Sequence, residues 1–301
     1  IWSAVRKADL LISGGGSLLQ NVTSGRSLYY YLSVILLARL AGTPVMLYAQ
    51  GIGPVCGGFA RWLMTAISRR VARITVRDYG SLEELRSLNI TQPPSEVTAD
   101  PVLAIHPVDR GIGRAILTKY KAAGAKPVVG ISVREWRGWS GYKKAIAAAA
   151  DEIAREFEAR VIFLPMQYPE DVEIARKIAA QAEETMIVLD EEYTTSELLS
   201  IVGNLDLLIS IRLHGLIFAG VMGVPMVGIS YDPKIDRFLD SIDEKPAADL
   251  KTATVGNIMA AVREKWANRK NEAEQREGRL AELRRLAARN AELALELIER
   301  M

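Results

Sequence analysis

The sequence has little cysteine, little histidine and almost no net charge. Among its 301 residues one is a cysteine, Cys56, and two are histidines, His106 and His214. A single thiol excludes a disulfide framework within the chain and is typical of a reducing compartment, where a lone thiol is more often buried or inert than reactive. The formal net charge of +2 is too small to indicate a nucleic-acid partner.

Metal-ligand clusters and long hydrophobic runs are also missing from the sequence. No histidine pair, cysteine cluster or close group of carboxylates has the spacing of a metal site, so we expect no metal. A helix that spans a bilayer needs about 20 apolar residues. The best candidate ends at Arg39, and residues 216–229 contain glycines and a proline. We therefore expect a cytoplasmic protein, and leave open a peripheral contact with the inner face of the membrane.

Short apolar runs alternate with helical segments along most of the chain. Uniformly apolar runs of this length indicate buried parallel strands, and helices are expected between them. The runs lie at residues 8–13, 44–49, 73–77, 127–133, 160–166, 205–210 and 226–231, with a short edge strand at 97–99. This order predicts an α/β protein with doubly wound parallel sheets.

The pattern occurs twice, which predicts two Rossmann-like domains with parallel sheets facing each other across a cleft, a GT-B-like arrangement. The segment A-D-L-L-I-S-G at 8–14 resembles L-D-L-L-I-S-I at 205–211, and an apolar helix, a G-x-P tripeptide and a strand follow each of them. A proline-containing linker places the domains at 1–107 and 108–261. Residues 262–301 predict a C-terminal helical segment that packs on the domains, with a coiled-coil partner or a membrane surface as alternatives.

Polar residues collect where the predicted strands end. Ligands of open parallel sheets bind beyond the carboxyl ends of the strands. These ends carry Gly14, Gly15, Gly16, Gln50, Gly51, Arg77, Arg134, Gln167, Arg212, His214 and Lys234. Arginine forks fit phosphate and carboxylate groups, and glycine turns before helices leave backbone N–H groups for an anion. Together they predict a small, strongly anionic ligand.

Each of these residues also has a structural explanation. The three glycines suit close packing of a strand on a helix as well as they suit an anion. Arg77 could pair with Asp78 at the start of a helix, Arg134 could stack on Trp136, and Lys234 could simply be solvated. A histidine in such a sequence is usually a buried, hydrogen-bonded core residue. The position of His214 at a helix start beside Arg212 favours a functional role instead.

The motifs, in this order, resemble the polysaccharide pyruvyltransferase family, and their spacing is most similar to its CsaB-type branch. They are G-G-G-S at 14–17, Q-G-I-G-P at 50–54, V-R-D at 76–78, T-A-D-P at 98–101, G-I-S-V-R at 130–134, P-M-Q at 165–167, R-L-H at 212–214, G-V-P at 223–225 and Y-D-P-K at 231–234. Members of the family usually begin with a strand and a G-N-x-G-D-E-like loop. This sequence lacks both, so we expect the first strand and loop of the N-terminal domain to be missing.

The resemblance implies transfer of a pyruvyl group from phosphoenolpyruvate to a sugar, with formation of a ketal and release of phosphate. It implies no cofactor other than phosphoenolpyruvate as co-substrate. In the CsaB-type branch the acceptor is an N-acetylmannosamine residue of a lipid-linked precursor of secondary cell wall polymer, and the product anchors S-layer proteins.

The resemblance also implies roles for the candidate residues. Arg212 and His214 would be catalytic, with His214 in proton transfer or phosphate binding. The substrate-binding residues would be Arg77, Lys234, Arg134 and Gln167, together with the glycine loops at 14–16 and 50–53. These loops belong to the N-terminal domain, which would bind the acceptor. The C-terminal domain would bind the donor.

Two other functions remain open from the residues alone. A GT-B glycosyltransferase or a sugar-nucleotide epimerase would use the same architecture, although the C-terminal domain has no obvious carboxylate for a nucleotide ribose. A non-catalytic module that binds a sugar or an anion is the other alternative. The oligomeric state is not predicted.

Overall fold

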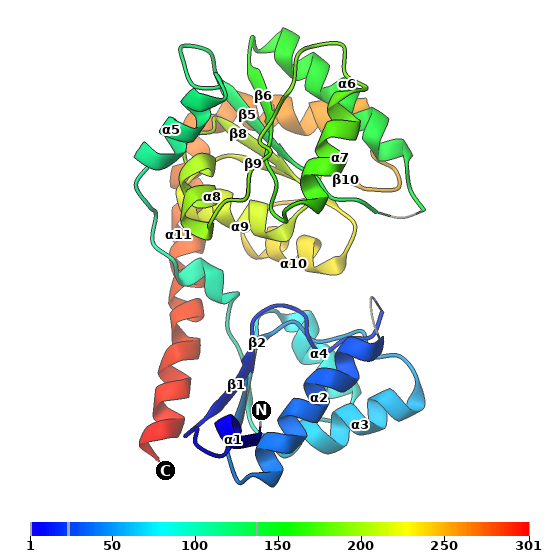
Figure 1. Cartoon of the computed structure of the whole chain (residues 1–301), viewed down its shortest axis with the longest axis vertical. Coiled ribbons are helices and arrows are strands. Elements are labelled where there is room, and N and C mark those ends of the chain that lie inside the picture. The colour runs from blue at the N-terminus through cyan, green and yellow to red at the C-terminus, as the bar shows by residue number, and fades with distance from the viewer. Residues whose placement is uncertain (1, 23–24, 137, 301) are drawn as a thin grey trace. The chain divides into compact units, whose positions relative to one another are not determined.

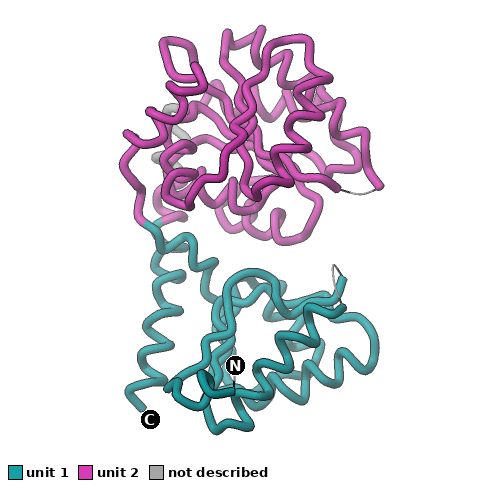
Figure 2. The backbone as a smooth tube through the Cα atoms, in the orientation of Figure 1, with its two compact units in different colours: residues 1–105, 281–301 teal, residues 106–280 magenta. Residues whose placement is uncertain are grey.

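The computed structural model describes residues 2–22, 25–136 and 138–300, without the side chains of residues 270–275. The chain forms two compact units, which Figure 2 colours separately. Unit 1 comprises residues 1–105 and 281–301, and unit 2 comprises residues 106–280. Each unit contains one sheet in which all paired strands are parallel.

Unit 1 is built on a four-stranded sheet in the order β1-β2-β3-β4. The strands are β1 (Leu11–Gly14), β2 (Val45–Gln50), β3 (Arg73–Val76) and β4 (Ser95–Val97). The helices are α1 (Trp2–Val5), α2 (Gly25–Leu40), α3 (Gly58–Ser68), α4 (Tyr79–Ser87) and the 3-10 turn η1 (Pro101–Ala104).

The two faces of the unit 1 sheet are covered by different helices. Successive side chains of a strand point to opposite faces. Accordingly, Val45 and Leu47 of β2 pack in one cluster with residues of α2 and α3, whereas Met46 packs with Leu293 and Ala294. The latter two belong to α11 (Val255–Glu299), whose last part runs along the sheet in Figure 1. Unit 1 is therefore a three-layered sandwich that includes the end of the chain.

Asn290 fixes the last part of α11 to the unit 1 sheet. Its side chain is fully buried. Its Oδ1 accepts hydrogen bonds from the hydroxyls of Thr75 at 2.6 Å and Thr98 at 2.8 Å, and its Nδ2 donates to the carbonyl oxygen of Ala99 at 3.2 Å. Because a buried polar group is costly without partners, these bonds specify where the helix lies on the strands.

Unit 2 contains a six-stranded sheet in the order β10-β9-β8-β5-β6-β7. The strands are β5 (Val128–Ser132), β6 (Arg160–Phe163), β7 (Ile187–Val188), β8 (Leu207–Ser210), β9 (Met226–Ser230) and β10 (Ala248–Asp249). The helices, besides the first part of α11, are α5 (Gly111–Lys119), α6 (Gly141–Glu156), α7 (Glu170–Ala179), α8 (Thr195–Val202), α9 (Leu213–Met222) and α10 (Pro233–Ser241).

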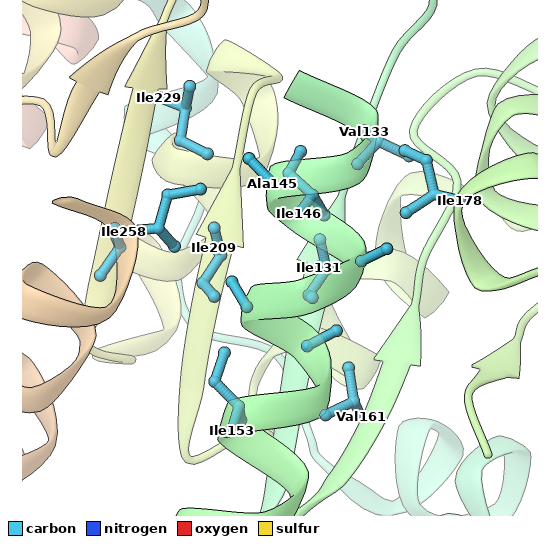
Figure 3. Packing of buried hydrophobic residues seen from close by; sticks show 14 of the residues in the cluster. Ile131, Val133, Ala145, Ile146, Ile153, Val161, Ile178, Ile209, Ile229 and Ile258 are labelled. Atoms are coloured by element: carbon cyan, nitrogen blue, oxygen red, sulfur yellow. The ribbon is translucent and has the colours of Figure 1, made fainter. Parts of the chain in front are cut away.

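The core of unit 2 explains why its strands are apolar throughout. The central strands β5, β8 and β9 are buried along their whole length. Figure 3 shows Ile131, Ile209 and Ile229 from these strands beside Ile146 and Ile153 of α6, all in one buried cluster. A strand covered on both faces has no polar side, so the sequence reads as an uninterrupted hydrophobic run.

The structure confirms the predicted fold class. The α/β architecture, the two parallel sheets and the long C-terminal helix are present. The helix begins at Val255 and does not form a separate third segment, because residues up to 280 belong to unit 2 and later ones to unit 1. The chain passes between the units after Ile105, close to the predicted boundary after residue 107. Cys56 is exposed, so of the two expectations for this thiol, buried or inert, burial is wrong.

Candidate functional site

The carboxyl ends of three neighbouring strands bring candidate residues to one edge of the unit 2 sheet. In register, Ser132 of β5 pairs with Ser210 of β8, and Ser210 pairs with Gly228 of β9. Arg134 and Arg212 each follow two residues after a paired serine, so their backbones reach the same edge. Tyr231 directly follows β9, and Lys234 lies in the first turn of α10, the next helix. The backbones of Arg134, Arg212 and Lys234 therefore follow neighbouring strands of one sheet, whereas Arg77 belongs to unit 1.

A buried carboxylate holds Arg212. Arg212 is the N-cap residue of α9, and a terminal nitrogen of its guanidinium donates to Oδ1 of Asp171 in a close ion pair. The side chain of Asp171 is only 1% exposed. Its Oδ2 accepts the backbone N–H groups of Met166 and Gln167 at 3.0 and 2.9 Å. Asp171 therefore orients the guanidinium of Arg212 and also holds the loop that carries Gln167. Gln167 itself is exposed.

Some hydrogen-bonding atoms at this edge have no acceptor or donor among the described residues. The Nε atoms of Arg134 and Arg212 and the Oγ atom of Ser132 are buried without a hydrogen-bond partner among the described residues. A buried donor left without an acceptor costs about 1–3 kcal/mol. Two guanidinium groups with spare N–H groups at one sheet edge are suited to accept an anion with several oxygen atoms.

Tyr231 brings two cations together. The guanidinium carbon of Arg134 lies 4.8 Å from the centroid of the Tyr231 ring, and Nζ of Lys234 lies 5.4 Å from the same centroid. Arg134 also donates a hydrogen bond to the Tyr231 hydroxyl and lies 5.3 Å from the Trp136 ring. Lys234 is not simply solvated, because it pairs with Asp232 at 3.4 Å. The stacking predicted as an alternative for Arg134 is confirmed, and it positions the cation at the site.

Tyr142 fixes the backbone at Arg134. Its hydroxyl donates to the carbonyl oxygen of Arg134 at 2.8 Å. Burial, assisted by the nearby negative charge of Glu135, raises the pKa of Tyr142 to about 12. The phenol is therefore protonated at neutral pH and keeps donating this bond.

His214 lies in the first turn of α9 and is exposed, so the alternative of a buried core histidine is wrong. Its ring centroid is 6.4 Å from that of Phe218. The first N–H groups of a helix have no intrahelical acceptor, which makes this end of α9 favourable for an anion. Gly215 lets the helix approach the strand, because a Cβ atom there would lie 2.5 Å from Oγ of Ser210.

In unit 1, Arg77 takes part in a buried ion-pair network. Its guanidinium donates to Oδ2 of Asp100 at 3.0 Å and to Oγ of Ser17 at 2.8 Å, and its Nε lies 3.8 Å from Oδ2 of Asp78. Asp78 also caps α4. Gly51 makes room for this network, since a Cβ atom there would lie 2.7 Å from the Arg77 guanidinium. Two carboxylates compensate the charge of Arg77, which favours the structural alternative over binding of a substrate anion.

The glycines at 14–16 divide into two roles. A Cβ atom at Gly14 would lie 2.4 Å from the carbonyl oxygen of Tyr48, so this glycine serves close packing of β1 on β2. Gly15 and Gly16 have φ angles of +75° and +77° and form the turn after β1.

Gln50, at the end of β2, is fully buried, and its Nε2 donates to the carbonyl oxygen of Ser13 at 2.9 Å. Its Oε1 has no partner among the described residues.

The described residues hold no cluster of three or more histidine, cysteine or acidic side chains suited to a metal ion. In the same part of the chain, every helix is too short or too polar to cross a bilayer.

Several solved structures share this fold at low sequence identity. UDP-GlcNAc 2-epimerase from Neisseria meningitidis, bound to UDP-GlcNAc, has a TM-score of 0.66 at 12% identity, covering 98% of this chain and 80% of that one. The Anabaena protein HepE in complex with UDP-glucose has a TM-score of 0.64 at 11% identity, covering 98% and 80%. A glycosyltransferase from Rickettsia africae has a TM-score of 0.62 at 11% identity, covering 100% and 80%. At these identities the likeness shows the GT-B-like fold alone.

The sequence comparisons are more specific. No curated protein gives a significant match. A family model described as polysaccharide pyruvyl transferase matches residues 1–233, which is most of the chain.

Proposed function

Because the chain belongs to the polysaccharide pyruvyl transferase family, we propose that it transfers the pyruvyl group of phosphoenolpyruvate to a sugar and releases phosphate. The observation that carries this proposal is the family match over residues 1–233. The site in unit 2 supports it, since Arg134, Arg212 and Lys234 follow neighbouring strands at one sheet edge. Phosphoenolpyruvate presents a phosphate and a carboxylate on three carbons, and guanidinium groups bind both bidentately.

The proposed reaction proceeds by proton transfer and electrostatic stabilisation. A proton adds to the vinyl carbon and forms the methyl group, and a sugar hydroxyl loses its proton as its oxygen attacks the adjacent carbon. The bond from that carbon to the phosphate oxygen then breaks, and a second hydroxyl oxygen closes the ketal and releases its proton to solvent. Arg212 would hold the phosphate at the N-terminus of α9, where the helix dipole favours negative charge. His214 would transfer a proton or bind the phosphate.

The acceptor is proposed from the resemblance to the CsaB-type branch. It would be N-acetylmannosamine of a lipid-linked precursor of secondary cell wall polymer, with the pyruvylated product used for S-layer anchoring. Unit 1 would bind it, because the turn at Gly15 and Gly16 after β1 offers polar backbone groups. Phosphoenolpyruvate is a cytoplasmic metabolite, which supports action at the inner face of the membrane.

Replacing Tyr231 tests whether the two cations that it positions bind the donor. Tyr231→Leu removes the ring shared by Arg134 and Lys234 and should raise the KM for phosphoenolpyruvate about tenfold, since each cation–π contact contributes about 0.5–2 kcal/mol. Tyr231→Phe is the matched control, because it keeps the ring and loses only the hydroxyl bond to Arg134. Equal KM values for phosphoenolpyruvate in wild type and Tyr231→Leu would show that Arg134 and Lys234 do not bind the donor.

Phosphate release separates the proposed reaction from its main rivals, a glycosyltransferase and a sugar-nucleotide epimerase. We expect the protein to release phosphate from phosphoenolpyruvate when a lipid-linked acceptor ending in N-acetylmannosamine is present. We expect neither release of UDP from UDP-GlcNAc nor its epimerisation. Turnover of the nucleotide sugar without use of phosphoenolpyruvate would reverse the assignment.

A further inference from the structure

Unit 1 exposes several large apolar side chains on α2 and α3. Six large hydrophobic side chains are between 40% and 69% exposed, and we refer to them as the aromatic face: Tyr29, Tyr30, Leu36, Leu40, Phe59 and Trp62. The opposite side of α2 buries Leu28, Leu32 and Ile35 in the core of the unit. The outward side of α2 therefore carries hydrophobic groups that its packing on the sheet does not use.

Ring contacts join the two helices of the aromatic face. The ring centroids of Tyr29 on α2 and Phe59 on α3 are 6.1 Å apart, and those of Phe59 and Trp62 are 5.9 Å apart. Contiguous apolar patches on a soluble protein mark interaction sites, whereas single exposed residues need no explanation. Tryptophan and tyrosine are enriched at membrane–water interfaces, because each combines an apolar ring with a polar atom.

The two helices that carry the aromatic face bear basic but no acidic residues, although Arg61 of α3 pairs with Glu84 of α4. Residues 1–77 contain nine lysine and arginine residues but a single acidic residue, Asp9, although the whole chain has a net charge of only +2. Arg26, on α2, and Arg70, just after α3, are both exposed. This combination of clustered rings and basic residues complements the surface of a lipid bilayer, in which anionic headgroups cover an apolar interior.

We propose that the aromatic face docks on the surface of an anionic phospholipid bilayer. The rings of Phe59 and Trp62 enter the headgroup layer, and Arg26 and Arg70 contact lipid phosphates. A peripheral contact of this kind needs no membrane-spanning helix. The proposal goes beyond pyruvyl transfer and would bring unit 1 to the layer in which a lipid-linked acceptor resides. It is tested with vesicles alone, so its outcome does not depend on the proposed reaction.

Sedimentation with vesicles provides the test. We expect the purified full chain to sediment with vesicles of phosphatidylcholine and phosphatidylglycerol but not with phosphatidylcholine alone, and to be released by high salt. The double variant Phe59→Ser, Trp62→Ser should lower the bound fraction about tenfold or more, since binding scales with the apolar area inserted. The matched control is Ile112→Ser with Leu295→Ser, which removes two exposed hydrophobic side chains elsewhere and should bind like wild type.

The single cysteine gives a second readout. Cys56 is exposed and lies three residues before Phe59. An environment-sensitive fluorophore on Cys56 should shift to shorter wavelength when anionic vesicles are added. Wild-type protein that stays in the supernatant, or double-variant protein that sediments as well as wild type, would overturn the proposal. A wild-type dimer that the double variant dissociates, without vesicle binding, would instead assign the aromatic face to a second copy of the chain.

Discussion

Arg212→Lys is expected to lower the rate of phosphate release from phosphoenolpyruvate about a hundredfold or more, while the stability of the protein changes little. Lysine keeps a positive charge beside the buried Asp171 but lacks the planar fork that binds phosphate through two parallel hydrogen bonds. Removing one donor to a developing charge typically costs a factor of about 100–1000 in rate. Steady-state phosphate release and thermal unfolding of the same preparations measure the two effects.

The lysine variant is more informative than Arg212→Ala. Alanine would leave the carboxylate of Asp171, 1% exposed, without its counter-ion, and a broken buried pair costs about 3–5 kcal/mol. Loss of activity would then be confused with loss of folding. The control is Arg176→Lys, at an exposed arginine that also pairs with an aspartate, Asp190. If Arg212→Lys and Arg176→Lys both retain full turnover, Arg212 is not part of the active site.

Asn290→Ala is expected to destabilise the protein by about 3 kcal/mol, because it removes hydrogen-bond partners of several buried groups at once. The hydroxyls of Thr75 and Thr98 lose their shared acceptor, and the carbonyl oxygen of Ala99 loses a donor. These groups join β3 and the segment after β4 to the last part of α11. Urea unfolding followed by tryptophan fluorescence should show a lower midpoint.

Asn268→Ala provides the matched comparison for Asn290→Ala. It makes the same substitution in the same helix at an exposed position, where alanine has the better helix propensity, so stability should be unchanged or slightly higher. Equal unfolding midpoints for the two variants would show that the Asn290 bonds do not stabilise the packing of α11 on unit 1.

The sequence predicts the strands of this fold well for a physical reason. Strands of a parallel sheet covered on both faces are apolar at every position, so β5, β8 and β9 stand out as short hydrophobic runs. The carboxyl-end rule then places Arg134, Arg212 and Lys234 at one sheet edge without any structural information. The position of these residues in the fold could be predicted because each one follows a strand that the sequence itself marks as an apolar run.

The partners that position these cations are harder to predict. Asp171 reads in the sequence as one of three acidic residues in the first turn of α7, a position where acids are common on any helix. Its importance comes from Arg212, forty-one residues later. One signal was available: Asp171 lies at helical spacing on the stripe that buries Ile174, Ala175 and Ile178.

Asn290 shows the same relation between sequence and structure. It lies on the apolar stripe of α11 with Ala287, Leu293 and Ala294, all of which are buried. A polar residue in such a stripe indicates that buried partners exist, but the identity of those partners depends on tertiary packing. Arg77 is a third example, because the sequence predicts it as a substrate-binding residue with ion pairing as the alternative, and only the structure shows Asp100 and Ser17 beside it.

The central claim is that the chain uses phosphoenolpyruvate as a donor of the whole pyruvyl group. The most direct measurement is a reaction in D₂O with phosphoenolpyruvate and an acceptor ending in N-acetylmannosamine, followed by mass spectrometry and NMR of the sugar product. The proposed mechanism predicts a pyruvate ketal with one deuterium in its methyl group, formed together with an equal amount of inorganic phosphate. An unmodified acceptor and intact phosphoenolpyruvate, with turnover seen only when UDP-GlcNAc is supplied, would contradict it.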